Sequence, residues 1–241
     1  ALAIASVRLL RAVGVWHRVA EAAQPILQIR TGDSQAGGGN VPFFLTFDHA
    51  EIEEGPMGQM VEDRHLYAAF LEAMRGQAGV TLLSGETVVA QEAGTGGVTV
   101  TLASGRKVTA GLLVGCDGRG SGVAARAGIR RIGWGYGQTA LVTAIRHAKD
   151  HEGVASQVFM PTGPLAILPL KGGHHSSIVW SETDEVATAV QALPDAAYLE
   201  VLRPKFGDRL GEIALAGARF TYPLSLSLAE RFIAPRVALV G

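Results

Sequence analysis

The sequence predicts a mixed α/β (α+β) fold, in which helices and strands alternate irregularly along the chain. A short apolar run at residues 112–114 ends in Gly-Cys-Asp-Gly and leads into a helix-compatible run, which is typical of a strand-to-helix turn. Strand-like runs joined by Gly, Pro and His turns fill residues 139–181. Apolar residues at helical spacing occupy the start of the chain and residues 60–74.

The first third of the chain predicts two helices with a hairpin between them. A loop over residues 32–40, with three consecutive glycines, separates the two strands of that hairpin. In order, the predicted elements are an amphipathic helix ending at Gly14, a helical continuation over 15–23, strands over 26–31 and 41–47, a helix within 60–74 and a short strand over 80–83.

The remaining elements follow from alternation and turn signals. Ala-Ser-Gly-Arg at residues 103–106 predicts a hairpin, and Pro204 is expected to bend or split the last helix. The predicted strands are 87–93, 98–102, 107–110, 112–114, 139–145, 156–160, 165–170, 177–181, 219–226 and 237–240, and the predicted helices are 124–127, 184–193 and 195–210.

Composition excludes several classes of function. The chain has 241 residues, is 48% hydrophobic and carries a net charge of −1, so we expect a globular protein with no nucleic-acid partner. One cysteine, Cys116, allows no disulfide within the chain. No apolar run approaches the roughly 20 residues of a membrane helix, and a cytoplasmic location is expected.

The most informative motif surrounds Asp117, which follows the apolar run at 112–114 and precedes Gly118 and Ser121. A carboxylate at the end of a strand can accept hydrogen bonds from sugar hydroxyls, and glycines let the backbone approach a ligand closely. Two alternatives stay open: Gly120, Gly122 and Ala125 fit the looser G-x-G-x-x-G/A dinucleotide pattern, or the segment is an ordinary glycine-rich turn.

These residues resemble the DGxxSxV motif of flavin-dependent aromatic hydroxylases, with Asp117, Gly118, Ser121 and Val123 in the four positions. Ala124 stands where that motif has arginine, which weakens the implication of NAD(P)H binding. Further blocks resemble the ubiquinone-biosynthesis hydroxylases in order and spacing: LLRAVGVW, FDHAEI, GQMVEDRHL, GWGYGQTALV, FMPTGPLAILPL, FGDRLGEI and YPLSLSLAERFIAPRVALVG.

The resemblance implies the para-hydroxybenzoate hydroxylase fold, with an FAD-binding domain and an antiparallel-sheet substrate domain. Residues 1–25, 60–130 and 227–241 are expected to form parts of the FAD-binding domain, and residues 26–59 and 131–226 the substrate-binding domain. The family's GxGxxG loop and its C-terminal flavin loop are expected to lie outside the chain. We therefore expect these residues alone to bind FAD weakly or not at all.

The resemblance also implies residue roles. Asp117 and Gly118 would contact the flavin ribitol or ribose, Ser121 the cofactor or only the helix N-terminus, Arg64 an FAD phosphate and the Val88 backbone the adenine. On the substrate side it implies a turn at Gly163 and Pro164 that faces the flavin, and a pocket with Trp180, Phe159 and Tyr222; a plain turn and core packing are the alternatives. No residue is assigned to catalysis, and no metal site is expected: His174 and His175 suggest an exposed loop.

The implied enzyme is an FAD-dependent monooxygenase that uses NAD(P)H and O₂ to hydroxylate a polyprenylated phenol in ubiquinone biosynthesis. Other ubiquinone-biosynthesis proteins are implied as partners, with at most peripheral contact with the inner membrane. Two alternatives remain: a hydroxylase of a soluble aromatic compound, and a non-catalytic fragment or assembly module that cannot hold FAD.

Overall fold

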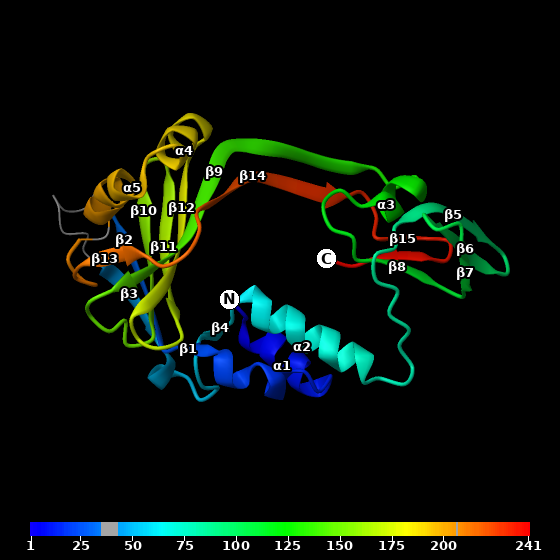
Figure 1. Ribbon diagram of the computed structural model, residues 1–241, viewed down its shortest axis with the longest axis horizontal. Helices are drawn as coiled ribbons and strands as arrows, with labels where there is room; N and C mark the ends of the chain where they lie inside the picture. The colour runs from blue at the N-terminus through cyan, green and yellow to red at the C-terminus, as the bar shows by residue number, and fades with distance from the viewer. Residues whose placement is uncertain (35–42, 206) are drawn as a thin grey trace. The chain divides into compact units, whose positions relative to one another are not determined.

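The computed structural model describes residues 1–34, 43–205 and 207–241 (Figure 1). The chain divides into two compact units. Unit 1 comprises Ala1–Val80 and Gly137–Leu224, and unit 2 comprises Thr81–Tyr136 and Ser225–Gly241. Two long strands, β9 (Arg131–His147) and β14 (Phe220–Ala229), each begin in one unit and end in the other. The assignment of segments to cofactor and substrate domains stays a prediction.

Unit 1 is built on a large, mainly antiparallel sheet. The strand order is β13-β9-β12-β11-β10-β2-β3, and β14 pairs with β9. Only β10 and β2 are parallel neighbours along this path among the described strands. The strands not yet bounded are β2 (Gln28–Asp33), β3 (Phe43–Asp48), β10 (Val154–Met160), β11 (Gly163–Leu170), β12 (His175–Thr183) and β13 (Ile213–Leu215).

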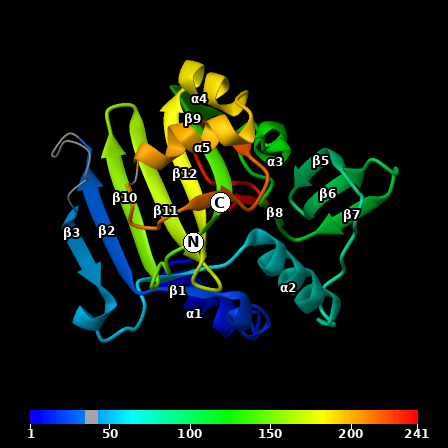
Figure 2. The ribbon, with the colours of Figure 1, turned by 60° about the vertical axis from the view of Figure 1, so that its left-hand side comes forward.

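Two helices, α4 (Asp184–Gln191) and α5 (Asp195–Leu202), pack on this sheet (Figure 2). The Thr183 hydroxyl caps α4 by accepting a hydrogen bond from the Val186 amide at 3.4 Å, and two acidic residues in the first turn complement the helix dipole. Alternating strand positions such as Leu141, Ile178 and Trp180 are fully buried beneath the helices. This face therefore forms the main hydrophobic core.

The N-terminal helices form a second cluster in unit 1. α1 (Ile4–Ala12) and α2 (Asp63–Arg75) share a core with Val15, Val19 and Val61. Residues 15–23, expected to continue helically, instead form two 3₁₀ turns at Trp16–Arg18 and Ala20–Ala22. A short ladder joins β1 (Gln24–Ile26) to β4 (Gly58–Met60).

The predicted hairpin is confirmed, because β2 and β3 pair antiparallel; its loop over 35–40 and the strand start at 41–42 lie outside the described residues. The single strand predicted over 26–31 is wrong. Ile26 pairs with β4 while Gln28 pairs with β10, so the chain changes partner at Leu27, whose amide donates to the Gly153 carbonyl at 2.9 Å. The strand predicted over 80–83 is also wrong, since no described strand pairs with this segment.

Unit 2 contains two small sheets and one short helix. The meander of β5 (Val88–Gly94), β6 (Gly97–Leu102) and β7 (Lys107–Ala110) confirms the hairpin predicted at 103–106. The other sheet has the order β15-β16-β8, with bounds Ile233–Ala234, Val237–Leu239 and Leu113–Gly115. α3 (Gly122–Arg126) follows β8 and packs through Ala124 against Ile129 and Ala229.

Strand β9 is much longer than the run predicted at 139–145. Its first half alternates bulky residues with glycine, a pattern that resembles a turn, although it belongs to the strand and only Gly137 there has a positive φ, of +66°. Gly133 is required by close packing: a Cβ there would lie 2.3 Å from the Leu226 carbonyl oxygen on β14. A Cβ at Gly135 would meet nothing within 4 Å.

We therefore expect Gly133→Ala to lower the free energy of unfolding by about 1–3 kcal/mol, because backbone must move to admit the methyl group. The matched Gly135→Ala variant should stay within about 0.5 kcal/mol of the parent protein. Urea unfolding of the two variants measures the difference. Equal stabilities would show that β9 and β14 do not approach as closely as described.

Candidate functional site

The candidate site lies where two parallel strands of unit 2 end. β8 and β16 pair in parallel with Gly115 opposite Leu239, and the Val240 amide donates to the Gly115 carbonyl at 3.0 Å. A Cβ at Gly115 would approach Val123 to 2.9 Å, so glycine allows α3 to pack against the end of β8. The carboxyl ends of parallel strands are a common location for ligand sites in α/β proteins.

Asp117 is held at this edge by hydrogen bonds to its carboxylate. The Ser121 hydroxyl donates to Asp117 Oδ1 at 2.5 Å, and the Val123 amide donates to Oδ2 at 3.0 Å. Ser121 Oγ in turn accepts from the Ala124 amide at 3.0 Å, so Ser121 is the N-cap of α3. The structural role considered for Ser121 is therefore confirmed, and Asp117 extends the same cap.

These bonds keep Asp117 ionised. Partial burial raises the pKa of this carboxyl, but hydrogen bonds from Ser121 and from the Val123 amide outweigh burial and hold the pKa below its ordinary value of 3.8. The stability that Asp117 contributes is therefore fully present above pH 3.8 and is lost as the pH falls through the lower, folded-state pKa. Near neutral pH the carboxylate acts only as an acceptor.

Ser121→Ala should raise the pKa of Asp117, because it removes the side-chain hydrogen bond that stabilises the charged form. An NMR titration of the Asp117 carboxyl carbon measures the midpoint. Ser225→Ala is the matched control, since Ser225 Oγ accepts from Arg119 and does not contact Asp117. An unchanged midpoint in Ser121→Ala would contradict the role given to the hydroxyl.

The residues present fit a polyhydroxylated ligand such as the ribitol of FAD. A carboxylate offers about four acceptor positions, and Ser121 and Val123 occupy two of them. Asp117 is exposed and lines a small hollow with Gly118, Val240 and Gly241. Gly118 has a φ of +74°, which a residue with a side chain rarely adopts, and nothing lies within 4 Å of its missing Cβ.

Arg131 is a site residue that the sequence did not reveal. Its side chain lines the same hollow, with Nε donating to Ser227 Oγ at 3.0 Å and Nη1 to the Gly118 carbonyl at 3.4 Å. It places a positive charge beside the ionised Asp117. No local motif distinguishes Arg131 from Arg130, which pairs with Glu230 at 2.9 Å instead.

The other predicted cofactor residues lie elsewhere in the chain. Arg64 belongs to unit 1, in the first turn of α2, and its exposed guanidinium pairs with Glu62 at 2.9 Å. Val88 begins β5 in unit 2, where a register shift separates its pairing with Leu102 from that of Ala90. Neither residue lines the hollow at Asp117.

The predicted substrate-side residues all belong to unit 1. Gly163 and Pro164 begin β11, and a Cβ at Gly163 would lie 2.8 Å from the Ser181 Cβ. Trp180 is fully buried in the main core, whereas Phe159 and Tyr222 are about half exposed. Core packing, the alternative considered for Trp180, is thus what its described contacts show.

Strand β9 carries an exposed stripe of bulky residues, which are further candidates for contact with a ligand. Ile132, Trp134 and Tyr136 alternate with glycines, so their side chains share one face of the strand. More than half of each side chain is exposed. In the sequence these three bulky residues stand at every second position, as on one face of a strand. The glycines between them made the segment resemble a turn instead.

Neither a metal-binding cluster nor a membrane-spanning helix is found among the described residues. Among residues 1–34, 43–205 and 207–241, no group of three or more His, Cys, Asp or Glu residues is placed to hold a metal ion. No helix in the described parts of the chain has the length and apolar character needed to cross a membrane.

The sequence is similar to a known protein family and to several characterised proteins. The family model described as FAD binding domain matches residues 2–241. Ubiquinone hydroxylase UbiL of Rhodospirillum rubrum is 42% identical over 241 residues, which cover all of this chain and 54% of that protein. The 3-demethoxyubiquinol 3-hydroxylase of Escherichia coli is 30% identical over 244 residues, covering all of this chain and 60% of that protein. The chain thus spans little more than half the length of these relatives, and the resemblance to ubiquinone-biosynthesis hydroxylases is confirmed.

Solved structures confirm the predicted fold. The flavin-dependent monooxygenase PieE, in complex with FAD and substrate, matches all of this chain and 45% of its own with a TM-score of 0.74 at 19% identity. PqsL of Pseudomonas aeruginosa, described as a probable FAD-dependent monooxygenase, matches all of this chain and 67% of its own with a TM-score of 0.82 at 20% identity.

Proposed function

Because the chain belongs to the FAD binding domain family, we propose that it serves in a flavin-dependent monooxygenase that hydroxylates the ring of a polyprenyl phenol in ubiquinone biosynthesis. One observation carries the cofactor part of this proposal. The Asp117 carboxylate is fixed and ionised at the carboxyl edge of two parallel strands, with acceptor positions left for hydroxyl groups.

The residues of unit 2 would bind and orient the cofactor. Asp117 would accept hydrogen bonds from ribitol or ribose hydroxyls, Gly118 would allow close backbone approach, and Arg131 would face an anionic part of the cofactor. Ser121 would act through Asp117 by fixing the carboxylate. When bound, FAD supplies the redox chemistry that activates O₂, so these residues need to supply no acid, base or nucleophile.

The residues that would contact an aromatic, prenylated substrate are apolar and exposed. The stripe of Ile132, Trp134 and Tyr136 offers such a surface, and Tyr222 offers another. Gly163 and Pro164 would shape the turn nearest the ring, as the resemblance implies. Arg64 and Val88 remain proposals for FAD phosphate and adenine contacts.

The reductant, the partner proteins and the location of the enzyme are proposed from the relatives. NAD(P)H is the proposed reductant, and the Ala124 departure makes its binding the least supported part. Other ubiquinone-biosynthesis proteins are the proposed partners. The proposed location is the cytoplasm. The hydrophobic polyprenyl substrate would bring the enzyme into peripheral contact with the inner membrane.

Expression of the protein in a strain that lacks a ubiquinone-ring hydroxylase tests the proposal. Mass spectrometry of the lipid extract should show the prenylated intermediate replaced by its hydroxylated product. Flavin absorbance of the purified protein is recorded in parallel. A flavin-loaded protein that leaves the prenylated intermediate unchanged but hydroxylates a soluble phenol would favour the soluble-substrate alternative. A protein without flavin absorbance and without product would favour the assembly module.

A further inference from the structure

Strands β10 and β11 are joined by a tight turn of only two residues, Pro161 and Thr162. Met160, the last residue of β10, pairs with Gly163, the first residue of β11. This is the turn that the proposed function places beside the aromatic ring. Its position would therefore decide how closely the chain approaches a bound substrate.

Gly163 fixes the side of this turn that faces β12. Its φ is +143°, a conformation that residues with a side chain rarely adopt. A Cβ at this position would lie 2.8 Å from the Cβ of Ser181 and 2.9 Å from its carbonyl oxygen. Ser181 belongs to β12 and is only 5% exposed, so it is held within the sheet. The turn therefore has no room to move closer to β12.

Gln138 holds the same turn from a strand that is not its neighbour. Gln138 lies on β9 opposite Thr183, and β12 separates β9 from β11 in the sheet. Its Nε2 donates a hydrogen bond to the Thr162 carbonyl at 2.6 Å. A carbonyl oxygen can only accept, so the nitrogen of the side-chain amide must face the turn. One side chain thus links β9 to the turn across β12.

The turn has little else to fix its direction. In the described parts of the chain, Gln138 is the only side chain that hydrogen-bonds to Pro161 or Thr162. Pro161 has no N–H group to donate. The close approach at Gly163 blocks movement toward β12, but it supplies no directional bond that would prevent movement away from it. Loss of the Gln138 bond would therefore leave the turn free to tilt.

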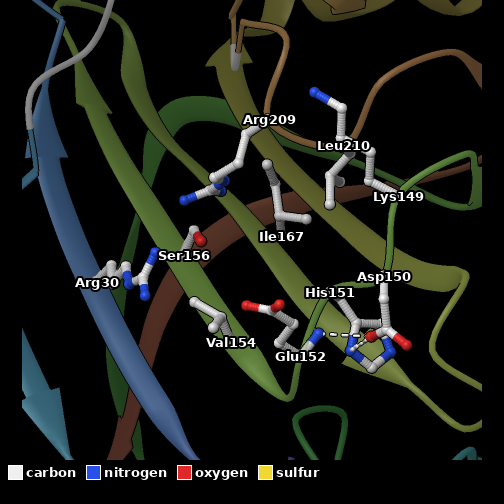
Figure 3. Close-up of a pocket in the computed structure, with 10 residues that line it drawn as sticks. All are labelled: Arg30, Lys149, Asp150, His151, Glu152, Val154, Ser156, Ile167, Arg209 and Leu210. Carbon is white, nitrogen blue, oxygen red and sulfur yellow. Dashed lines mark hydrogen bonds and ion pairs between the residues drawn. The ribbon is translucent and has the colours of Figure 1, made fainter.

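The same two strands also border a cavity of about 260 Å³ in unit 1 (Figure 3). Ser156 of β10 and Ile167 of β11 pair with each other and line this cavity, farther along the strands from the turn. Neither of the two turn residues, nor Gln138, is among the residues that line it. The hydrogen bond of Gln138 therefore acts on the turn and not on this cavity.

We propose that Gln138 is a positioning residue for the proposed hydroxylation: by holding the Thr162 carbonyl, it fixes the turn at Gly163 and Pro164 against the substrate ring. This role rests on the proposed function, and Gln138 acts through the turn without touching substrate or flavin. A displacement of about 1 Å in a positioning group can cost up to about a hundredfold in rate. When the ring is misplaced, O₂ takes up the two electrons of NAD(P)H and two protons and leaves as hydrogen peroxide, instead of forming the ring hydroxyl and water.

Turnover assays of Gln138→Met test this role in a protein that carries these residues together with the GxGxxG loop and the C-terminal flavin loop of the family. A farnesylated phenol serves as the substrate, with NADH and NADPH supplied in parallel. We expect kcat for the hydroxylated product to fall about tenfold and KM to change less than about threefold, with more hydrogen peroxide per NAD(P)H oxidised. The affinity for FAD should not change.

Gln191→Met is the matched control. Gln191 lies on α4 in the same unit, and its Nε2 also donates to a backbone carbonyl, that of Arg219, at 3.2 Å. The control removes the same kind of hydrogen bond away from the turn, so its hydroxylation should stay coupled to NAD(P)H oxidation. Gln138→Glu is a second variant, because an ionised glutamate keeps the shape of the side chain but has no donor. It should uncouple the reaction even if Gln138→Met disturbs β9, and thermal unfolding checks the folding of all three variants.

Unchanged coupling in both Gln138 variants of a parent protein that does hydroxylate would overturn the role of Gln138 alone. Equal uncoupling in Gln191→Met would also overturn it, because the effect would then follow from a general loss of stability. A parent protein that binds FAD but forms no hydroxylated product would overturn the proposed function, and the role of Gln138 with it.

Discussion

Replacing Trp180 with alanine is expected to lower the free energy of unfolding by about 3–5 kcal/mol, as is usual for removing a fully buried tryptophan. Trp180 lies in the main core with no exposed surface, and its ring meets the Tyr198 ring edge-on at 6.3 Å. Its Nε1 donates to Glu182 Oε1 at 2.9 Å. The substitution leaves a cavity and removes one of two partners of a buried carboxylate, the other being Lys205 Nζ at 3.4 Å.

Trp134→Ala is the matched control, because Trp134 is 57% exposed on β9. Its removal should change stability by no more than about 0.5 kcal/mol. Guanidinium unfolding followed by circular dichroism compares the two variants without relying on tryptophan fluorescence. A Trp180→Ala protein as stable as Trp134→Ala would place Trp180 in a pocket rather than in the core, as the resemblance first implied.

Replacing Asp117 with asparagine is expected to weaken FAD binding about tenfold or more, because each hydrogen bond from a ribitol hydroxyl would lose its charged acceptor. Asparagine keeps the size of the side chain and one acceptor oxygen for the Val123 amide. Fluorescence titration with FAD measures the affinity in a protein that carries these residues together with the GxGxxG loop and the C-terminal flavin loop of the family. Glu92→Gln, an exposed carboxylate on β5 in the same unit, removes the same charge and should bind FAD normally.

The structural role of Asp117 at α3 requires a second comparison. Ser121→Ala breaks the Ser121–Asp117 hydrogen bond and the cap of Ala124 while leaving the carboxylate in place. If Asp117 acts on FAD directly, Asp117→Asn weakens binding far more than Ser121→Ala does. Equal losses in the two variants, together with equal losses of stability, would mean that Asp117 only anchors the helix.

Local features of this chain could be predicted because local chemistry determines them. The apolar run before Asp117 and the small residues after it specify a strand, a sharp turn and a helix start, and Ser121 was correctly considered as an N-cap. The strands of unit 1 were predicted because their buried residues alternate. The family was inferred from the resemblance of several sequence motifs to those of flavin-dependent hydroxylases.

Features that depend on distant segments could not be predicted. The hollow at Asp117 exists because β16 pairs with β8 across more than a hundred residues, and no local signal encodes that pairing. Arg131 is directed there by Ser227 and by the Gly118 carbonyl. The break at Leu27 likewise follows from two different strand partners, β4 on one side and β10 on the other.

A crystal structure, with FAD bound, of a protein that carries these residues together with the other flavin loops of the family would show whether Asp117 holds the sugar-alcohol chain of the flavin. We predict a ribitol or ribose hydroxyl within hydrogen-bond distance of the Asp117 carboxylate, with the Ser121 and Val123 bonds intact. A bound flavin whose hydroxyls all lie beyond hydrogen-bond reach of Asp117 would contradict it.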